Sequence, residues 1–395
     1  MDDLAVLATV VLAYALLSRR LEASVVSAPL VFVAAGILAG PDVLGLVHVE
    51  FSEGAGLIVA EVALAFVLFS DAARIDLDCL RSGDRLPARL LGIGMPLTIA
   101  LGVGAGALLL TDIDFWEAAI IAAVLAPTDA ALGQAVVKSQ RVPRRMREGL
   151  SVEAGLNDGL SVPFLALFAA LAVDQADISA QSWLGFASEQ IGYGALIGIA
   201  VGGAGGWLVT QASRREWMSA AFQHLAVLAL AILAFVLADE AGGNGFISAF
   251  VGGLAAGRMG LGGERILEFL EEEGQLLSLA VFFIFGVAVL ELVEPAGWEV
   301  LVYAALSLTL VRVLPVAVAV AGTGMRPASV AFLGWFGPRG LASIVLALTV
   351  AEEHPDLPAL DVVLAAVSVT VLASVVLHGV TATPLVRAHA RGIAD

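Results

Sequence analysis

Two short runs place polar residues where the surrounding sequence is apolar. EAGLNDGLSVP contains Glu153, Asn157 and Asp158, and VLAPTDAALG contains Thr128 and Asp129. A charge within a span of this hydrophobicity costs roughly 2.5–3.5 kcal/mol on membrane-insertion scales, so each one requires a partner or a role. Buried carboxylates bind protons or hard cations, and this is the chemistry that these residues offer.

Glu153 and Asp158 point in different directions if the run is helical. Five residues correspond to about 500° of rotation, so the two side chains are ~140° apart and cannot face one small ligand. We therefore expect Glu153 to form a structural ion pair with a buried arginine. Arg312 is the first choice of partner and Arg339 the second. Asp129 and Asp158, on two different helices, are left to face a common cavity.

A site built from Asp129 and Asp158 suits both a proton and a monovalent metal cation. Burial and a neighbouring like charge favour the protonated form of a carboxyl group. A hard cation prefers carboxylate, hydroxyl and backbone oxygens, and Thr128 with the carbonyls near 127–129 supplies the last two kinds. Competition between proton and cation is sufficient for exchange, because the empty, doubly charged site is too costly to move across the membrane.

Composition identifies the class of protein that positions these residues. The chain has 395 residues, of which 59% are hydrophobic and 14% charged, and its mean hydropathy is +0.95. These values are typical of a membrane protein. The net charge of −17 and the lack of a basic tail argue against binding nucleic acid, and a single cysteine excludes an internal disulfide framework. We expect no cleavable signal peptide, because the N-terminus is acidic.

Apolar stretches recur along the whole chain, and we expect about thirteen transmembrane helices in one all-α polytopic membrane domain. They lie near 3–17, 25–40, 56–72, 88–110, 115–137, 148–172, 183–210, 219–238, 242–258, 275–292, 298–321, 328–350 and 359–385.

The loops between these spans alternate in charge, and 18 of the 20 basic residues fall on one side. That side carries Arg19, Arg20, Arg74, Arg81, Arg85, Arg89, Lys138, Arg141, Arg144, Arg145, Arg147, Arg214, Arg215, Arg258, Arg265, Arg326, Arg387 and Arg391. The other side carries Glu50, Glu53, Asp112, Asp114, Asp174, Asp177, Asp239, Glu240, Glu291, Glu294, Glu352, Glu353 and Asp356. The positive-inside rule predicts an external N-terminus and a cytoplasmic C-terminus in the cell membrane. The two remaining basic residues, Arg312 and Arg339, lie within spans.

The fifth and twelfth spans contain helix-breaking residues near their middles. Pro127-Thr128-Asp129 interrupts one, and Gly337-Pro338-Arg339-Gly340 interrupts the other. The spans are seven apart, so they cross the membrane in opposite directions. Paired broken helices in antiparallel halves are typical of inverted-repeat transporters with a site near the midplane. The alternative is a pair of purely structural proline kinks.

Other functions have less support from the sequence. Ser70 and Asp71, at the end of the third span, are candidates for an ion pathway from the cytoplasmic face, the alternative being an interfacial position. An enzyme is disfavoured, because HExxH, GxSxG and transition-metal spacings do not occur. A cation channel, or a sensor on a transporter scaffold, is the rival class, but the sequence offers one buried cluster instead of repeated polar rings.

The motifs in this order resemble the NhaP-type monovalent cation/proton antiporters of the cation:proton antiporter-1 family, the Na+/H+ exchangers. The similarity covers nearly the whole membrane domain and rests on PTD, ExxxND, the buried arginine of the eleventh span and GPRG. GGNGFISAFVGGLAAG at 242–257 and LHGVTATPL at 377–385 also resemble family segments.

This resemblance implies two crossing broken helices and roles for individual residues. Asp158, preceded by Asn157, is the implied principal carboxylate for cation and proton, with Asp129 and Thr128 from the crossing helix. The resemblance also implies a Glu153–Arg312 ion pair. The residues implied to support the broken helices are Pro127, Gly337, Pro338, Arg339 and Gly340.

The family likeness also implies the organisation of the chain and its substrates. Residues 1–87 and 219–296 correspond to a dimerisation domain, 88–182 and 297–387 to a moving core, and 183–218 to a linking helix. A homodimer in membrane lipid, electroneutral one-for-one exchange and no cofactor are implied. Na+ is the leading cation, and K+ or Li+ could compete, because Ala154, the run AALGQ and the run LFSDAARID depart from many relatives. The chain ends soon after the last span, so we expect no cytoplasmic regulatory domain.

Overall fold

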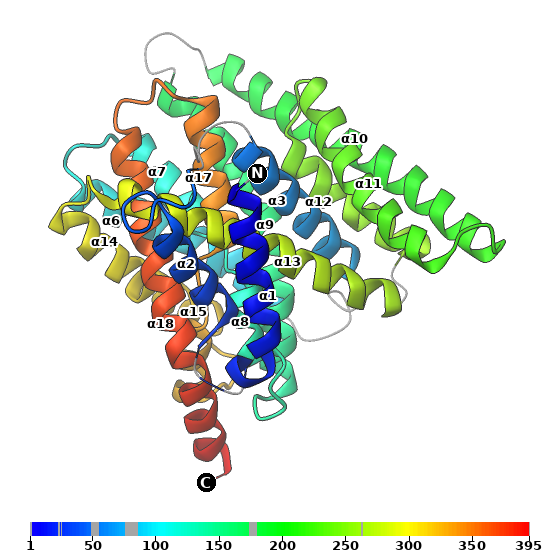
Figure 1. Cartoon of the computed structure of the whole chain (residues 1–395). Helices are drawn as coiled ribbons and strands as arrows, with labels where there is room; N and C mark the ends of the chain where they lie inside the picture. Colours follow the sequence, from blue (N-terminus) through cyan, green and yellow to red (C-terminus); the bar gives the residue numbers. More distant parts are fainter. Residues whose placement is uncertain are drawn as a thin grey trace.

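The computed structural model describes residues 2–22, 24, 26–48, 55–75, 86–173, 180–261 and 264–394. Within these ranges every regular element is a helix (Figure 1). The elements are α1 (Asp2–Glu22), α2 (Ala28–Ala39), α3 (Ala55–Ala73), α5 (Leu86–Arg89), η1 (Leu90–Gly94), α6 (Met95–Leu109), α7 (Phe115–Val124), α8 (Ala130–Val137), α9 (Arg144–Val173), α10 (Ala180–Arg214), α11 (Ala220–Glu240), α12 (Gly245–Ala256), η2 (Gly257–Leu261), α13 (Glu264–Val293), α14 (Trp298–Leu308), α15 (Leu310–Ala319), α16 (Pro327–Trp335), α17 (Leu341–Glu353) and α18 (Leu360–Ala394).

The predicted all-α membrane fold is confirmed. In the described part of the chain, nine helices have the length and apolar composition needed to cross a membrane, and three shorter helices are also apolar. Helical segments occupy all thirteen predicted stretches, while the number of crossings stays a prediction. The fifth and twelfth stretches are absent from the nine because each is broken into two short helices. Several charges used for the loop alternation lie outside the described residues: Glu50, Glu53, Arg81, Arg85, Asp174 and Asp177.

The two predicted interruptions are present, and they touch. α7 ends at Val124 and α8 begins at Ala130, while α16 ends at Trp335 and α17 begins at Leu341. Each gap contains a proline, which has no N–H to donate to the preceding turn. The backbone N–H of Asp129 donates to the carbonyl of Pro338 at 2.7 Å, so the two broken helices cross at their gaps.

A third break was not predicted. The eleventh stretch divides at Thr309, whose φ of −116° and ψ of −93° separate α14 from α15. The Thr309 hydroxyl donates to the carbonyl of Ala305 at 2.6 Å, which satisfies one acceptor at the end of α14. The break matters because Arg312 lies one turn beyond it, on α15.

The helices around these breaks form a closely packed bundle. α10 and α11 lie along one side of the molecule and pack with α12, whereas α6, α7 and α14 lie on the opposite side (Figure 1). α10 and α12 approach so closely that a Cβ on Gly202 would collide with the Gly252 carbonyl. Small residues of this kind let membrane helices pack backbone to backbone. α3, α9, α17 and α18 contribute to the main apolar core that surrounds the crossing.

Candidate functional site

Asp129 holds the two broken helices together at their crossing. It is the N-cap of α8, where its Oδ1 accepts from the N–H of Leu132 at 2.8 Å. Its Oδ2 accepts from the N–H of Leu341, the first residue of α17, also at 2.8 Å. A carboxylate therefore lies at the N-terminal, partially positive ends of two helices, which stabilises negative charge there.

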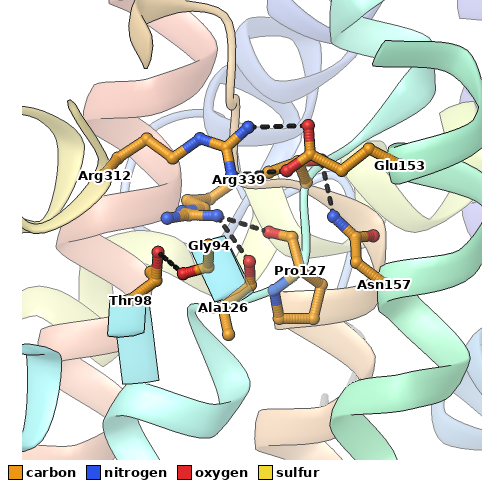
Figure 2. Close-up of polar contacts among 9 residues, drawn as sticks. Gly94, Thr98, Ala126, Pro127, Glu153, Asn157, Arg312 and Arg339 are labelled. Carbon is orange, nitrogen blue, oxygen red and sulfur yellow. Dashed lines mark hydrogen bonds and ion pairs between the residues drawn. The ribbon is translucent and has the colours of Figure 1, made fainter. Parts of the chain in front are cut away.

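Arg339 lies beside the C-terminal end of α7. Its Nη1 donates to the carbonyls of Ala126 and Pro127, at 2.8 and 2.9 Å, just beyond the end of α7 (Figure 2). The side chain has no exposed surface. A cation at this position complements the carbonyls that the break leaves without helical partners. The Ser343 hydroxyl, which donates to the carbonyl of Val124 at 2.7 Å, satisfies one more of them.

α9 brings Asn157 and Asp158 to this crossing. The Asn157 Nδ2 donates to the Thr128 hydroxyl at 2.7 Å, and Asp158 is 9% exposed. Within the described residues, Asn157 Oδ1 and Asp158 Oδ1 are buried and have no hydrogen-bond partner. Asp158 lies close enough to Asp129, Asp71 and Arg339 for their charges to act on it. The structure thus brings together Thr128, Asp129, Asn157 and Asp158.

Glu153 faces away from this group and contacts Arg312. The Arg312 Nη1 and Nη2 donate to Glu153 Oε1 and Oε2 at 2.6 and 2.9 Å, a bidentate arrangement (Figure 2). Both side chains are buried, with 2% exposure for Arg312 and 1% for Glu153. A Cβ on Gly337 would collide with this guanidinium, so the absence of a side chain there makes room for Arg312.

A cavity of about 770 Å³ connects the crossing with the surface. Its lining includes the buried residues Ser70, Thr128 and Asp129 together with Asp71. The same lining extends to exposed residues of the loop that precedes α9 and of its first turns, namely Lys138, Arg144, Arg145 and Glu148. An ion can therefore reach Asp129 from the side on which these basic residues lie, whereas Asn157 and Asp158 are not among the residues that line this cavity.

The donor set suits a monovalent cation. No group of three or more histidine, cysteine, aspartate or glutamate residues with metal-binding geometry occurs among the residues that the structure describes. The oxygens gathered here are two carboxylates, one hydroxyl, one amide and backbone carbonyls. Such oxygens can replace part of the hydration shell of a singly charged hard ion.

Two serines at the crossing were not predicted from the sequence. Ser343 lies three residues after Gly340, and Ser374 lies in the last span, where its hydroxyl accepts from the N–H of Arg339 at 2.7 Å. The position of Ser374, one helical turn before His378 in a long apolar run, is the only sequence signal for it. Hydroxyls in membrane helices more often bond to their own helix, so that signal is weak.

Gly340→Ala is expected to impair the site through Asp129. A Cβ at position 340 would collide with Asp129 Oδ2. Overpacking of this kind typically costs ~1–3 kcal/mol, and the collision would also displace the carboxylate from the N–H of Leu341. Purified Gly340→Ala should unfold at a lower temperature than wild type. Gly104→Ala is the control, since nothing lies within 4 Å of a Cβ at that position. Equal stability of the two variants would contradict this packing.

Comparison with known proteins gives a consistent family. A family model described as "Sodium/hydrogen exchanger, transmembrane" matches residues 6–388. The K(+)/H(+) antiporter NhaP2 of Shewanella sp. (strain ANA-3) is 26% identical over 368 residues, which cover 91% of this chain and 62% of the relative. The Na(+)/H(+) antiporter NhaG of Bacillus atrophaeus is 24% identical over 361 residues, which cover 87% of this chain and 68% of that relative. This chain thus spans about three fifths of the length of NhaP2.

A solved structure has the same fold. The sodium proton antiporter MjNhaP1 from Methanocaldococcus jannaschii superimposes with a TM-score of 0.74 at 20% sequence identity. The superposition covers 96% of this chain and 100% of that one.

Proposed function

The chain belongs to the sodium/hydrogen exchanger transmembrane family, and from that premise we propose that it is a secondary active antiporter that exchanges a monovalent cation for H+. Sodium is the leading cation and potassium the alternative, since relatives are named for each. The observation that carries the proposal is the position of four buried residues. Asp158 and Asn157 lie beside Asp129 and Thr128, where the two broken helices cross.

The two carboxylates have different roles in this proposal. Both oxygens of Asp129 accept backbone N–H groups, so Asp129 is a fixed negative charge that also holds the helices. Asp158 has an oxygen that is buried and has no hydrogen-bond partner in the described chain. Asp158 is therefore the carboxylate that takes up either a proton or the cation. Asn157 Oδ1 and the Thr128 hydroxyl complete the cation's oxygen shell.

One exchanging carboxylate supports electroneutral one-for-one transport. The charge of Glu153 is matched by Arg312 in both loaded states, and Asn157 does not ionise. Moving the site with a proton or with a singly charged cation then carries the same net charge. The empty site carries an additional buried negative charge, which makes its movement costly and couples the two fluxes.

The cavity supports alternating access with one side open. In the proposed orientation, with the N-terminus outside and the C-terminus in the cytoplasm, Lys138, Arg144 and Arg145 lie on the cytoplasmic side, so the Thr128 and Asp129 side of the site opens inward. Ser70 and Asp71 are the proposed pathway residues on α3. We assign residues 88–182 and 297–387 to a core that moves, elevator-like, against residues 1–87 and 219–296, with 183–218 as the linking helix. A homodimer in the cell membrane is part of this proposal.

The exchange assay tests the function and the choice of cation together. The purified chain in proteoliposomes should dissipate an imposed pH gradient when a monovalent cation is added. Sodium, potassium and lithium should be compared from mildly acidic to mildly alkaline pH. Choline is the control, because its methylated ammonium group shields the charge and prevents direct coordination by the carboxylate and hydroxyl oxygens. Dissipation without any added alkali cation would indicate a proton leak or channel instead of an exchanger.

A further inference from the structure

The break in the twelfth span removes several helical hydrogen bonds, and both partners of one of them contact α18 instead. In a continuous helix the N–H of Arg339 would donate to the carbonyl of Trp335. Here that N–H donates to the Ser374 hydroxyl at 2.7 Å. The Trp335 carbonyl lies 2.9 Å from His378 Nε2 and also accepts from the N–H of Gly337.

Ser374 and His378 are themselves hydrogen-bonded, and a ring protonated only at Nε2 gives every bond of the series one donor and one acceptor. They are one turn apart on α18, and Ser374 Oγ lies 3.1 Å from His378 Nδ1. A carbonyl can only accept, so Nε2 must carry the ring proton. The Ser374 oxygen accepts from Arg339, which leaves its own proton for Nδ1. The result is three hydrogen bonds in series, from Arg339 through Ser374 and His378 to Trp335.

The surroundings of the ring agree with this neutral form. His378 is 1% exposed. Its Nδ1 also lies 3.0 Å from the Ser374 carbonyl, to which a ring protonated at Nδ1 would donate, but a neutral ring of that tautomer would leave no donor for the Trp335 carbonyl. Arg339 and Arg312 are the charged groups that act on the ring, and both are cations. A charged ring would therefore be a third cation in a buried space.

We propose that Ser374 and His378 are positioning residues for the ion site, acting as a relay that replaces the missing helical bond. The relay holds Trp335 and Arg339, the two sides of the gap, at a fixed separation. That gap contains the Pro338 carbonyl, which accepts from Asp129, and it leads directly to the Leu341 N–H, which donates to Asp129. The relay thus fixes the position of Asp129 without touching it. This inference rests on the proposed function, because it assigns residues to the same site.

Four variants separate the relay from general packing. His378→Leu and Ser374→Ala break it and should raise the half-saturating cation concentration about tenfold, the effect of leaving one buried group unsatisfied. His378→Gln should stay within about twofold of wild type, because an amide supplies one donor and one acceptor but does not titrate. Thr370→Val is the control, since the Thr370 hydroxyl is buried and donates to the carbonyl of Ala366 in its own helix.

Two measurements decide the proposal. The first is the half-saturating cation concentration in proteoliposomes, with transport normalised to folded protein. Wild-type values for His378→Leu and Ser374→Ala would overturn the relay. Equal impairment of His378→Gln and His378→Leu would overturn it as well. The second is ¹⁵N NMR of histidine-labelled protein, with the His378 signal assigned by its loss in His378→Gln. A proton on Nε2 alone is expected, and a proton on Nδ1 would overturn the relay even if His378→Leu does not fold. This readout does not involve transport, so a chain that exchanges no cation would refute the proposed function and leave the relay testable.

Discussion

Asp158→Asn is expected to abolish cation-dependent proton exchange in proteoliposomes, with little change in the amount of folded protein. Asparagine has nearly the same shape as aspartate, but it can neither carry a negative charge nor exchange a proton near neutral pH. Asp158 Oδ1 has no hydrogen-bond partner among the described residues, so the substitution breaks no bond at that atom. The measurement is the initial rate of pH-gradient dissipation, with folded protein determined by size-exclusion chromatography.

Two further substitutions make this result specific. Asp129→Asn should also abolish exchange, but it should lower the unfolding temperature as well, because one of two backbone N–H groups would lose its acceptor. Asp361→Asn, which removes a carboxylate from an exposed position on α18, should leave transport unchanged. Wild-type exchange by both Asp158→Asn and Asp129→Asn would remove the proposed site.

Glu153→Ala is expected to reduce folded protein severely, although Glu153 is only five residues from Asp158. Arg312 would be left as an unpaired charge with 2% exposure, and removal of one partner from a buried ion pair typically costs ~3–5 kcal/mol. This is a large part of the stability of an ordinary domain. The measurement is the yield of monodisperse protein together with its unfolding temperature in detergent.

A double variant distinguishes a stranded charge from a lost site residue. Glu153→Gln combined with Arg312→Gln removes both charges and should recover part of the folded protein lost in Glu153→Ala. Apparent cation affinity in the recovered protein should stay close to that of wild type, since neither residue contacts the proposed cation. Normal folding of Glu153→Ala combined with weaker cation binding would place Glu153 in the ion site instead.

These opposite expectations follow from helix geometry. The spacing of Glu153 and Asp158 already separates their directions by ~140° in any regular helix. α9 is continuous from Arg144 to Val173, so this rotation is maintained. Glu153 faces α15 and Asp158 faces the crossing. One helix therefore carries a residue proposed to maintain the fold and a residue proposed to exchange ions.

Much of the fold follows from local sequence. Apolar stretches of membrane-spanning length predict helices in all thirteen places where helices occur, because lipid leaves backbone groups no other partners. Pro127 and Pro338 predict the two gaps, because a proline has no N–H with which to donate a helical hydrogen bond. The break at Thr309 was missed because the sequence carries no proline or glycine at that point, and threonine is only a weak helix breaker.

The sequence by itself determined which residues are costly to bury: Asp129, Glu153, Asp158, Arg312 and Arg339. It also limited the directions in which the two carboxylates of one helix, Glu153 and Asp158, can point. Only the tertiary structure decided how they combine: Arg312 and not Arg339 contacts Glu153, and Arg339 contacts the carbonyls at the end of α7. It alone brought Ser374 and His378 to the gap of the twelfth span. The physical reason is that burial cost belongs to a residue type, whereas a hydrogen bond requires two atoms to meet, and separate helices meet only when the whole bundle packs.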